Sequence, residues 1–591
     1  MKKRRNDYVN TQLSASFITM QNLINCYIRE TGQGIWRSVN GISNEEVLVI
    51  ELKKQPVTLY LPVKYRSVTG RHLFKRELCY QIHHQEMKEL DMVTLLSLFM
   101  KEVTDDLLQV NDFIVRVLLS YENMNLFIER RKHELEECYK WDKTFLQSEQ
   151  SLLIGHQLHP TPKSRQGILP EEEFIFAPEL KGNFQLHYFR AHRSIVKEQS
   201  AYSQSATNII KKQLIQDKTI SREFTLKYCQ DDEYTLIPMH PLQARFLLGK
   251  EEVTNWIHKE QLTYLGPQGG LFYPTSSVRT VYSPDADVMY KFSIPVKITN
   301  SLRVNKVKEL NRGVEVARLL QASLESELHA QYPAFQFVKD PAFVMLGDEE
   351  LGFEVMIRDN PFKEEGYNTT LLASLCQDHV FNEASQLTNI IRNICNNNNL
   401  TTEQASEIWF KRYIDITLKP MLWLYTQKGI ALEAHQQNSI IHLDQDGYPS
   451  IFYYRDNQGY YFMKSKEAAL RELLPTLNRE SDTVCEDGVA EERFRYYVFF
   501  NHIFGLINAF GVSNLIDERK LLTLLREELT PYLLQDHTQL VTSLLEHKEL
   551  PCKANFLTRV HDMDELVGAL ETQSVYVNID NPLYKAVGVN Q

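Results

Sequence analysis

The chain has 591 residues and carries 65 basic against 76 acidic side chains, which gives a net charge of −11. Apolar residues make up 43% and charged residues 24%, a globular composition that excludes a disordered or fibrous protein. The negative balance argues against nucleic acid or an anionic membrane as the main partner, so any anion site must be local.

The first 152 residues predict an N-terminal lobe that alternates helix and short strand. Residues 47–50 and 57–61 are typical of strands because of their β-branched content. A long amphipathic helix is expected next, beginning near Thr104 and Asp105. Its apolar positions at helical spacing are Leu107, Leu108, Ile114, Val117 and Leu118.

Extended segments dominate residues 153–395. They are residues 234–239, 278–282, 288–294, 342–346 and 353–357. Helices such as 304–323 accompany them. This tract predicts a mainly antiparallel sheet with helices attached.

Residues 396–591 read as largely helical. The asparagine run 396–399 predicts a turn, Thr401 and Gln404 form a capping box, and Gly429 is expected to end the helix between them. Further helices are predicted at 466–472, 493–510, 521–534 and 540–545, with a strand at 450–454. We therefore expect three lobes, 1–152, 153–395 and 396–591, packed together.

Targeting and membrane signals are weak. Residues 1–5 are basic, but polar residues 6–12 follow where a secretion signal needs an apolar run. The longest uncharged run, 496–516, contains Asn501 and His502 and predicts a buried helix, not a membrane span. The eight cysteines have no CxxC pair and are expected to be reduced. These features favour a cytoplasmic protein with no membrane partner.

Residues 155–167 place two imidazoles, an ammonium and a guanidinium between glycines and prolines. Proline fixes φ and glycine allows unusual backbone, so a shaped loop is expected. His156, His159, Lys163 and Arg165 could donate to phosphate or carboxylate, because arginine offers a planar fork and lysine a movable point charge. A solvated basic surface is the alternative.

A second group of donors enters the predicted strand at 278–282. Ser276, Ser277, Arg279 and Thr280 set hydroxyls beside a guanidinium, which suits a triphosphate; a Ser/Thr-rich hairpin is the alternative. Lys291 follows within an apolar strand. Because an unpaired buried charge is costly, Lys291 needs an anionic partner, either structural or a ligand phosphate.

The third group is residues 433–438 with a later carboxylate. Glu433, Asn438 and Asp456 supply the carboxylate and amide oxygens that suit Mg²⁺. Zinc is disfavoured because the sequence has no HExxH motif. The absence of a GxSxG elbow and of a Walker A motif argues against hydrolase and P-loop classes.

In this order the motifs resemble the NRPS-independent siderophore (NIS) synthetases of the aerobactin-synthetase family. The resemblance runs from about residue 155 to 456, through segments 155–165, 240–243, 277–280, 291–303, 433–438 and 455–456. The conjunction is far more specific than any single motif. The family usually has proline where Gln157 stands and tryptophan where Leu242 stands, differences that bear on pocket shape more than on chemistry.

The resemblance implies an α+β fold with a three-lobed, cupped-hand architecture: a thumb, fingers with a mainly antiparallel sheet, and a largely helical palm. It implies an enzyme that uses ATP to adenylate a carboxylate of citrate, a citrate derivative or 2-oxoglutarate. The acyl group then passes to an amine or hydroxyl, with release of AMP and pyrophosphate. A homodimer is also expected, and no covalent enzyme intermediate is needed.

Site roles follow from the same motifs. Phosphates of ATP would be held by Ser276, Ser277, Arg279 and Thr280, with Lys291 at the α-phosphate and further donors from His156, Lys163 and Arg165. Substrate carboxylates would be oriented by Arg303 and His435, with Thr299, Gln437 and His159 as weaker candidates. Mg²⁺ would be served by Glu433, Asn438 and Asp456. Fixed cations and a metal would lower the repulsion between polycarboxylate and triphosphate.

Two other functions are compatible with the same residues. A phosphotransferase could arrange ATP and Mg²⁺ with Lys291, Asn438 and Asp456, and would release ADP. A non-catalytic protein could bind an anionic metabolite in the same basic pocket without ATP, although it gives no reason for the grouping around Glu433.

Overall fold

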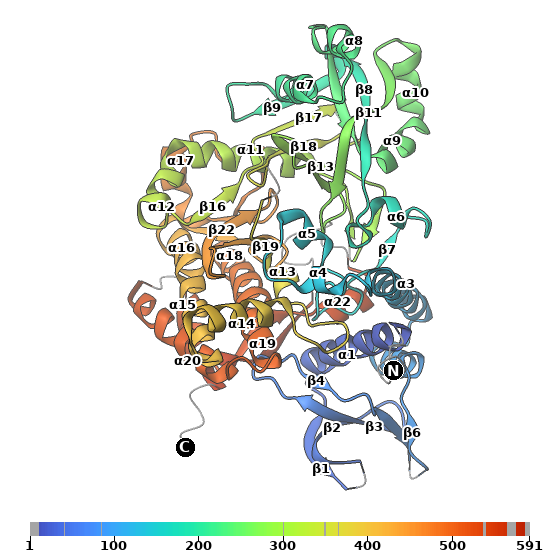
Figure 1. The fold of residues 1–591 in the computed structure, drawn as a ribbon, viewed down its shortest axis with the longest axis vertical. Helices are drawn as coiled ribbons and strands as arrows, with labels where there is room; N and C mark the ends of the chain where they lie inside the picture. The colour runs from blue at the N-terminus through green and yellow to red at the C-terminus, as the bar shows by residue number, and fades with distance from the viewer. Residues whose placement is uncertain are drawn as a thin grey trace.

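The computed structural model describes residues 11–585 except 41, 84, 300, 348–349, 364–365, 536–538 and 564–574. The molecule is elongated, with the N-terminal strands at one end, the largest sheet at the other and the C-terminal helices between them (Figure 1). This mixed architecture confirms the predicted α+β class.

The N-terminal region packs helices on an antiparallel sheet of order β1-β2-β3-β5-β6, with β4 beside β3. Its strands are β1 (Ile35–Val39), β2 (Ser43–Glu51), β3 (Val57–Tyr65), β4 (Leu73–Phe74), β5 (Cys79–Ile82) and β6 (Lys88–Glu89). Its helices are α1 (Thr11–Thr31), α2 (Met92–Val103), α3 (Leu107–Arg131), α4 (Leu135–Tyr139) and α5 (Phe145–Gln150). Both predicted strands lie within β2 and β3.

The start of the long helix was expected two residues too early. The side chain of Asp106 caps α3 by accepting from the amides of Leu108 and Gln109. Leu107 and Leu108 occupy the first turn and are 74% and 81% exposed, so their predicted place on the buried face is wrong. Val117, predicted for the same face, is buried, and so is Phe113, which the prediction did not include.

The middle of the chain forms an eight-stranded sheet of order β10-β8-β11-β12-β13-β18-β17-β9, in which every pairing is antiparallel. Its strands are β8 (Phe184–His192), β9 (Val196–Ser200), β10 (Tyr234–Met239), β11 (Leu262–Pro274), β12 (Thr280–Tyr282), β13 (Val288–Phe292), β17 (Ala342–Leu346) and β18 (Val355–Asp359). The predicted antiparallel sheet is confirmed. The strand expected from residue 278 begins only at Thr280, because the preceding residues form a turn.

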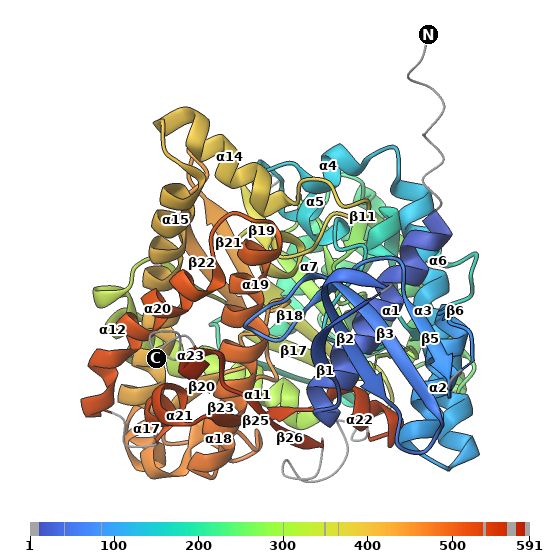
Figure 2. The same ribbon diagram turned by 90° about the horizontal axis from the view of Figure 1, so that it is seen from below.

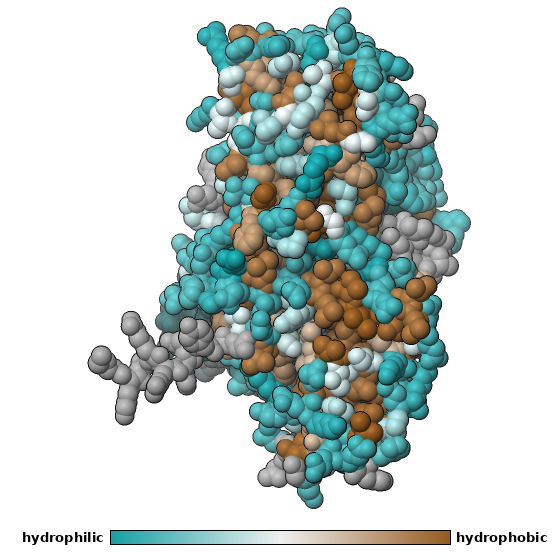
Figure 3. All heavy atoms as spheres, turned by 90° about the vertical axis from the view of Figure 1, so that its right-hand side faces the viewer, coloured by the Kyte–Doolittle hydropathy of each residue, from teal (hydrophilic) through white to brown (hydrophobic). Residues whose placement is uncertain are grey.

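Short helices cover this sheet and a small second sheet lies beside it. The helices are α6 (Glu173–Phe176), α7 (Ala206–Gln216), α8 (Arg222–Phe224), α9 (Pro241–Leu248), α10 (Glu251–His258), α11 (Val307–Leu319) and α12 (Glu325–Gln331). The second sheet contains β7 (Arg165–Gln166), β14 (Lys297–Ile298) and β15 (Ser301–Leu302). On the face that carries α3, α6, α9 and α10, apolar and polar surface alternate, with the widest apolar area at the height of α3 (Figure 3).

The C-terminal region has the largest apolar core of the molecule. Its helices are α13 (Leu372–Leu375), α14 (Gln386–Asn398), α15 (Thr402–Ile416), α16 (Leu418–Trp423), α17 (Glu467–Leu473), α18 (Asp487–Phe494), α19 (Phe504–Val512), α20 (Glu518–Leu529) and α21 (Leu540–Glu546). Its strands are β16 (Phe335–Val338), β19 (Thr369–Leu371), β20 (Ile430–Leu432), β21 (Ser439–Leu443), β22 (Pro449–Arg455), β23 (Tyr460–Met463) and β24 (Val484–Cys485). The capping box at Thr401 and the left-handed end at Gly429 are confirmed.

Two details of this region differ from expectation. Asn396 to Asn398 belong to α14, and only Asn399 adopts the left-handed backbone that ends the helix. The uncharged run is buried as predicted, but a π-helical segment (Arg495–Ile503) joins α18 to α19. Within the described part of the chain, no helix has the length and apolarity to cross a membrane.

The chain finally returns to its N-terminal region, where β25 (Glu549–Lys553), α22 (Asn555–Val560) and β26 (Tyr576–Asp580) lie beside α1 (Figure 2). The Glu30 carboxylate accepts from the first amides of α22, at 2.9 Å from Phe556 N and 2.8 Å from Leu557 N. The chain ends, as described, with α23 (Pro582–Lys585). The expected boundaries at 152/153 and 395/396 stay predictions; β16 and β19, from before the second one, pair with β22 and β21 after it.

The buried side chain of Lys143 should make the stability of the protein depend on pH. Lys143 is fully buried, and its ammonium nitrogen lies 3.4 Å from the Ser374 hydroxyl. Burial lowers the pKa of Lys143 to about 7. The unfolded chain therefore holds one more proton than the folded chain between pH 7 and the ordinary lysine pKa, so Lys143 makes stability rise with pH in that window and opposes folding fully below it.

We expect Lys143→Met to stabilise the protein by about 1–3 kcal/mol at pH 7, because it removes a buried, poorly compensated charge. The gain should shrink as pH rises from 7 to 10. Denaturant unfolding at several pH values measures it, with Lys140→Met, a more exposed neighbour, as control. A constant gain across this range would contradict the assigned titration.

Candidate active site

A cavity of about 300 Å³ lies where residues 152–165, the turn before β12 and segment 433–458 meet. All of the residues expected to form a site line this one cavity. They are His156, His159, Lys163, Arg165, Ser276, Ser277, Arg279, Thr280, Lys291, Thr299, Arg303, Glu433, His435, Gln437, Asn438 and Asp456. The structure thus brings together side chains from segments up to 300 residues apart, from His156 to Asp456.

The basic loop is fixed by buried ion pairs. Lys163 contacts Glu179, and Arg165 reaches Glu173 at 2.9 Å and Glu179 at 2.7 Å. Burial alone would raise the pKa of Glu179, but the two cations lower it to about 2. The backbone of Arg165 also pairs with Ile298 in the small sheet. Both cations line the cavity while their charge is balanced from behind, so the loop is rigidly held.

The turn before β12 presents hydroxyls and amides to the cavity. Val278 has φ of +66°, an uncommon conformation for a β-branched residue and a sign of local strain. The turn is closed by bonds from the amide of Val278 to Thr275 O and from the amide of Thr280 to Ser277 Oγ, at 2.8 and 3.2 Å. The Ser276 hydroxyl accepts from Gln437 Nε2 at 3.1 Å, which ties the turn to the third motif.

Two cations, Arg279 and Lys291, lie next to this turn. Arg279 is buried and donates to Val304 O, to Asn305 Oδ1 and to Gln458 Oε1 at 3.1–3.2 Å. Burial, with nearby Arg303, lowers the pKa of Arg279 to about 10. Its side chain therefore remains a cation at neutral pH, held in place by three acceptors.

Lys291 sits on β13, 5% exposed, and has the anionic partner that its position required. Its ammonium contacts Asn457 Oδ1 and lies 3.5 Å from Asp456 Oδ1. Burial and Arg279 lower the pKa of Lys291 to about 8. Asp456 is thus a structural anionic partner of Lys291, the first of the two partners that the sequence allowed.

Arg303 follows β15 and is anchored at one end of its guanidinium. Its Nη2 donates to Ile298 O at 3.0 Å and to Thr299 Oγ1 at 3.1 Å. Thr299 has φ of +54°, so the short turn between β14 and β15 places its hydroxyl under the guanidinium. The planar group is thereby oriented at the cavity wall, as recognition of a carboxylate requires.

Glu433 and Asp456 converge at Gly459. A Cβ at Gly459 would stand 2.2 Å from Glu433 Cβ and 2.8 Å from Asp456 Oδ2, so only glycine fits between the two acids. Burial and Asp456 raise the pKa of Glu433 to about 7. Burial would also raise the pKa of Asp456, but Lys291 and Arg358 hold it below its ordinary value.

The third expected metal ligand adjoins this pair. Asn438 Nδ2 lies 3.2 Å from Asp456 Oδ2. Two mutually repelling carboxylates beside an amide fit a hard divalent cation such as Mg²⁺, which would relieve the repulsion. Among the described residues, no group of three or more His, Cys, Asp or Glu side chains is arranged to hold a metal ion.

His435 lines the same cavity beside these acids. Its Nδ1 accepts from the amide of Gln437 at 3.2 Å, and its Nε2 stands 3.8 Å from Glu433 Oε1. Burial lowers the pKa of His435 to about 4, although Asp456 opposes the shift. The ring is therefore neutral at pH 7 and offers a hydrogen bond, not a charge.

Sequence reasoning missed residues that connect the motifs. Arg455 pairs with buried Glu149 at 2.6 Å, and Glu149 also accepts from the amide of Ser276 at 2.7 Å. Asn501, in the π-helical segment, accepts from the amide of Gln436 at 3.1 Å and contacts His156. A signal existed, since Asn501 interrupts an apolar run, but nothing in that run shows which loops it joins.

Asn501 should act as a positioning residue. We expect Asn501→Leu to lower kcat/KM by about 10–100-fold, because a small displacement of a site loop is costly. Asn501→Asp, which keeps the acceptor for Gln436, should retain more activity. Steady-state kinetics of both variants test this; equal losses would contradict a role through the Gln436 amide.

The cavity wall is rich in cations although the protein is acidic. Eight Lys and Arg side chains line it together with Glu433 and Asp456, and five of the eight pair with a carboxylate. The cations are Lys163, Arg165, Arg279, Lys291, Arg303, Arg358, Arg455 and Lys553. Such a wall suits a polyanion or two anions held side by side.

Comparison with known proteins agrees with this chemistry. The model of the IucA / IucC family matches residues 144–377. A spermidine-citrate ligase of Bacillus anthracis is 45% identical over 97% of this chain and 98% of its own length. This chain belongs to the IucA/IucC family of siderophore synthetases. It is accordingly an ATP-dependent ligase.

Other relatives extend the likeness over the whole chain. The rhizobactin siderophore biosynthesis protein RhbC of Rhizobium meliloti is 33% identical over 97% of this chain and 98% of its own. The ATP-bound aerobactin synthetase IucA of Klebsiella pneumoniae superposes with a TM-score of 0.87, at 25% identity, over 96% of this chain and 99% of that one. This chain therefore has the same overall fold as that structure.

A second family model, described as ferric iron reductase FhuF-like transporter, matches residues 407–568. That segment contains only two cysteines, Cys485 and Cys552. None of the eight cysteines forms a disulfide.

Proposed function

We propose that this ligase adenylates a carboxylate of citrate and transfers the citryl group to a primary amine of a polyamine of the spermidine kind. The observation that carries the proposal is the cationic cavity with its paired acids, in a chain 45% identical to a spermidine-citrate ligase. The product would be an amide of a siderophore precursor. A homodimer and a cytoplasmic location remain part of the proposal.

The chain's residues would divide the work along the cavity. Ser276, Ser277 and Thr280 would donate to phosphate oxygens, with Arg279 and Lys291 providing fixed charge where the α-phosphate is attacked. These groups are already held by the protein, so little reorganisation is needed as charge develops. Pyrophosphate leaves when the acid's oxygen bonds to the α-phosphorus.

The acid would be held beside the phosphates, since Gln437 contacts Ser276 and Arg303 lies near Arg279. Arg303 and His435 would bind two carboxylates of citrate, assisted by Thr299, Gln437 and His159. Both groups are anchored by the protein, so they would fix which carboxylate faces the nucleotide. The amine then attacks the acyl carbon and AMP departs, which requires no nucleophile from the chain.

Two further roles follow from the contacts. Because the cations of Lys163 and Arg165 are balanced by Glu179 and Glu173, we propose that they mainly hold the loop that carries His156, and donate to ligand secondarily. Glu433, Asn438 and Asp456 would hold Mg²⁺, which when bound neutralises phosphate charge.

The test is pyrophosphate release and ATP–pyrophosphate exchange with Mg²⁺, run separately with citrate, with 2-oxoglutarate and without acid. Each arm is repeated with spermidine, with a hydroxylated amine and without nucleophile. Citrate-dependent exchange, and AMP release increased by spermidine, are expected. Production of ADP without pyrophosphate would instead support the phosphotransferase. Binding of citrate with no turnover in any arm would support the non-catalytic alternative.

A further inference from the structure

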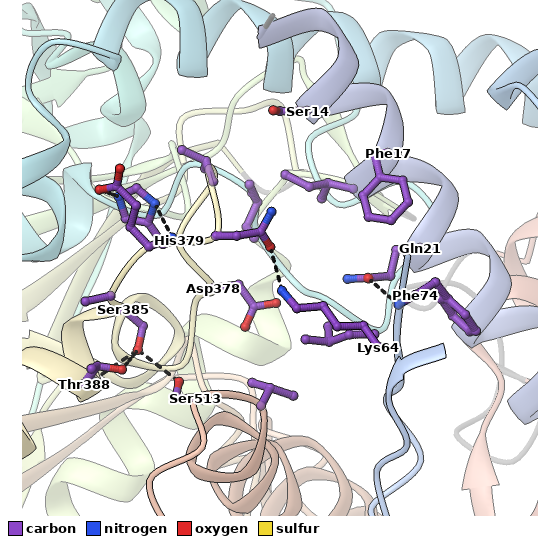
Figure 4. Close-up of a pocket in the computed structure, with 18 of the residues that line it drawn as sticks. Ser14, Phe17, Gln21, Lys64, Phe74, Asp378, His379, Ser385, Thr388 and Ser513 are labelled. Atoms are coloured by element: carbon purple, nitrogen blue, oxygen red, sulfur yellow. Dashed lines mark hydrogen bonds and ion pairs between the residues drawn. The ribbon is translucent and has the colours of Figure 1, made fainter. Parts of the chain in front are cut away.

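A second cavity, of about 380 Å³, lies apart from the candidate active site. It is enclosed by α1, by β3 and β4 with the residues that follow them, by residues 378–385, by the start of α14 and by the end of α19 (Figure 4). The two cavities share no lining residue. We propose that this second cavity binds a small organic acid with two or more carboxylates, and that its occupancy affects the active site.

Unsatisfied donors point to a ligand with acceptors. Asn22 is 2% exposed, and its Nδ2 has no hydrogen-bond partner among the described residues. Arg71 is 4% exposed; its terminal nitrogens contact Asn508 and Asp378, but its Nε has no partner in the described part of the chain. Buried donors left unpaired are costly, so a side-chain rotation that brings either nitrogen to an acceptor in the cavity would be favoured.

The charged side chains that line the cavity also favour an anionic ligand. Lys64, Arg71, Arg76 and Arg392 stand against the carboxylates of Asp378 and Glu383. Lys64 and Asp378 both point into this space, where the Lys64 ammonium donates to Asn382 Oδ1 at 3.3 Å (Figure 4). Ser385 caps the N-terminus of α14 on the same wall, adding the positive end of a 13-residue helix.

The lining also selects an organic acid over inorganic phosphate. Phe17, Phe74 and Val512 give the cavity an apolar side that suits a carbon skeleton. The Asp378 carboxylate could accept from a hydroxyl of the ligand but would repel a compact dianion. A hydroxylated or plain polycarboxylate therefore matches this cavity better than phosphate does.

One short segment separates the two cavities. Ile154 lines the second cavity and the next residue, Gly155, lines the active site. Gln377 clamps this segment, accepting from the amide of Ile154 at 2.9 Å and donating to Ser151 O at 3.0 Å. Asp378, which faces the cavity, is the next residue. A ligand that moves Asp378 would thus act on the loop that carries His156.

Binding is tested by calorimetric titration with tricarballylate, a tricarboxylate, in the Arg303→Ala background, which suppresses binding at the active site. About one molar equivalent should still bind. Lys64→Glu combined with Arg392→Glu, both at exposed positions, should weaken this binding at least tenfold, and so should Asn22→Leu. Arg222→Glu, on α8, is the matched control and should change nothing. Inorganic phosphate should bind at least tenfold more weakly than tricarballylate.

Coupling is tested separately with the otherwise wild-type enzyme. Tricarballylate should change the maximal rate of pyrophosphate release at saturating citrate at least twofold, and the Lys64/Arg392 variant should lose this response while keeping its basal rate. Loss of all binding in Arg303→Ala, unchanged binding in the cavity variants, or stronger binding of phosphate would overturn the proposed site. Binding without any rate effect would overturn the coupling. The titration needs no turnover, so its result is independent of the proposed function.

Discussion

Lys291→Met abolishes adenylation while the protein stays folded: we expect ATP–pyrophosphate exchange to fall about 10³-fold. The reason is positional. Lys291 is a buried cation held by Asn457 and Asp456 at the wall where the nucleotide would react. A fixed charge that meets developing negative charge in a water-poor site contributes about 10²–10³-fold or more to the rate.

Methionine preserves the volume of the side chain, but removing one partner of a buried ion pair is destabilising, by about 3–5 kcal/mol where the other charge is left uncompensated. Arg358 still faces Asp456, so we expect a lower melting temperature with the protein folded at the assay temperature. Lys308→Met, at a half-exposed lysine of α11, is the matched control and should keep full exchange. Lys291→Arg should recover part of the rate. Exchange within threefold of wild type in Lys291→Met would remove this residue from the reaction.

The sequence predicted which residues line one cavity better than it predicted the contacts among them. Ser276 to Thr280 form a local turn whose donors are neighbours in the chain, so their common orientation follows from spacing alone. Glu433 and Asn438 are likewise held within one loop. Predictions about residues that share one turn or loop therefore hold even where the surrounding fold is predicted wrongly.

Contacts between segments that are distant in the sequence could not be predicted. The partners of Lys163 and Arg165 are Glu173 and Glu179, acids that no pattern distinguishes from surface glutamates. Asn501 joins two loops 280 residues apart in the chain, from His156 to Gln436. Only the packing of the π-helical segment against both loops makes that link, and periodicity carries no information about it.

The same limit explains the error at α3. Leu107 and Leu108 fit a helical apolar pattern, yet the capping residue Asp106 starts the helix beyond the reach of the neighbouring core. An apolar pattern predicts which face of a helix is buried, but it does not predict how far along the helix the neighbouring core extends. The second cavity is a further case, because Asn22, Arg71 and Arg392 are ordinary residues until the fold places them on one wall.

Arg303→Ala should separate recognition of the acid from recognition of the nucleotide. We expect kcat/KM for citrate to fall about 10³-fold, because a bidentate, charge-assisted contact would be lost and a carboxylate left without its partner. ATP affinity, measured by titration without acid, should change less than about twofold, since the phosphates would bind the turn before β12. The backbone of Arg303 is fixed by bonds to Ile294 and Val296, so the fold should survive.

The variant Arg303→Lys supplies the sharper comparison. It keeps the charge but loses the planar fork, which Thr299 and Ile298 orient in the native chain. An intermediate rate is expected, with most of the loss in KM for citrate. Arg222→Ala, remote and exposed, should behave as wild type. If ATP affinity and citrate kinetics fell together in Arg303→Ala, the guanidinium would belong to the nucleotide site. The acid would then have to be held by other cations of the same cavity, such as Lys553 or Arg455.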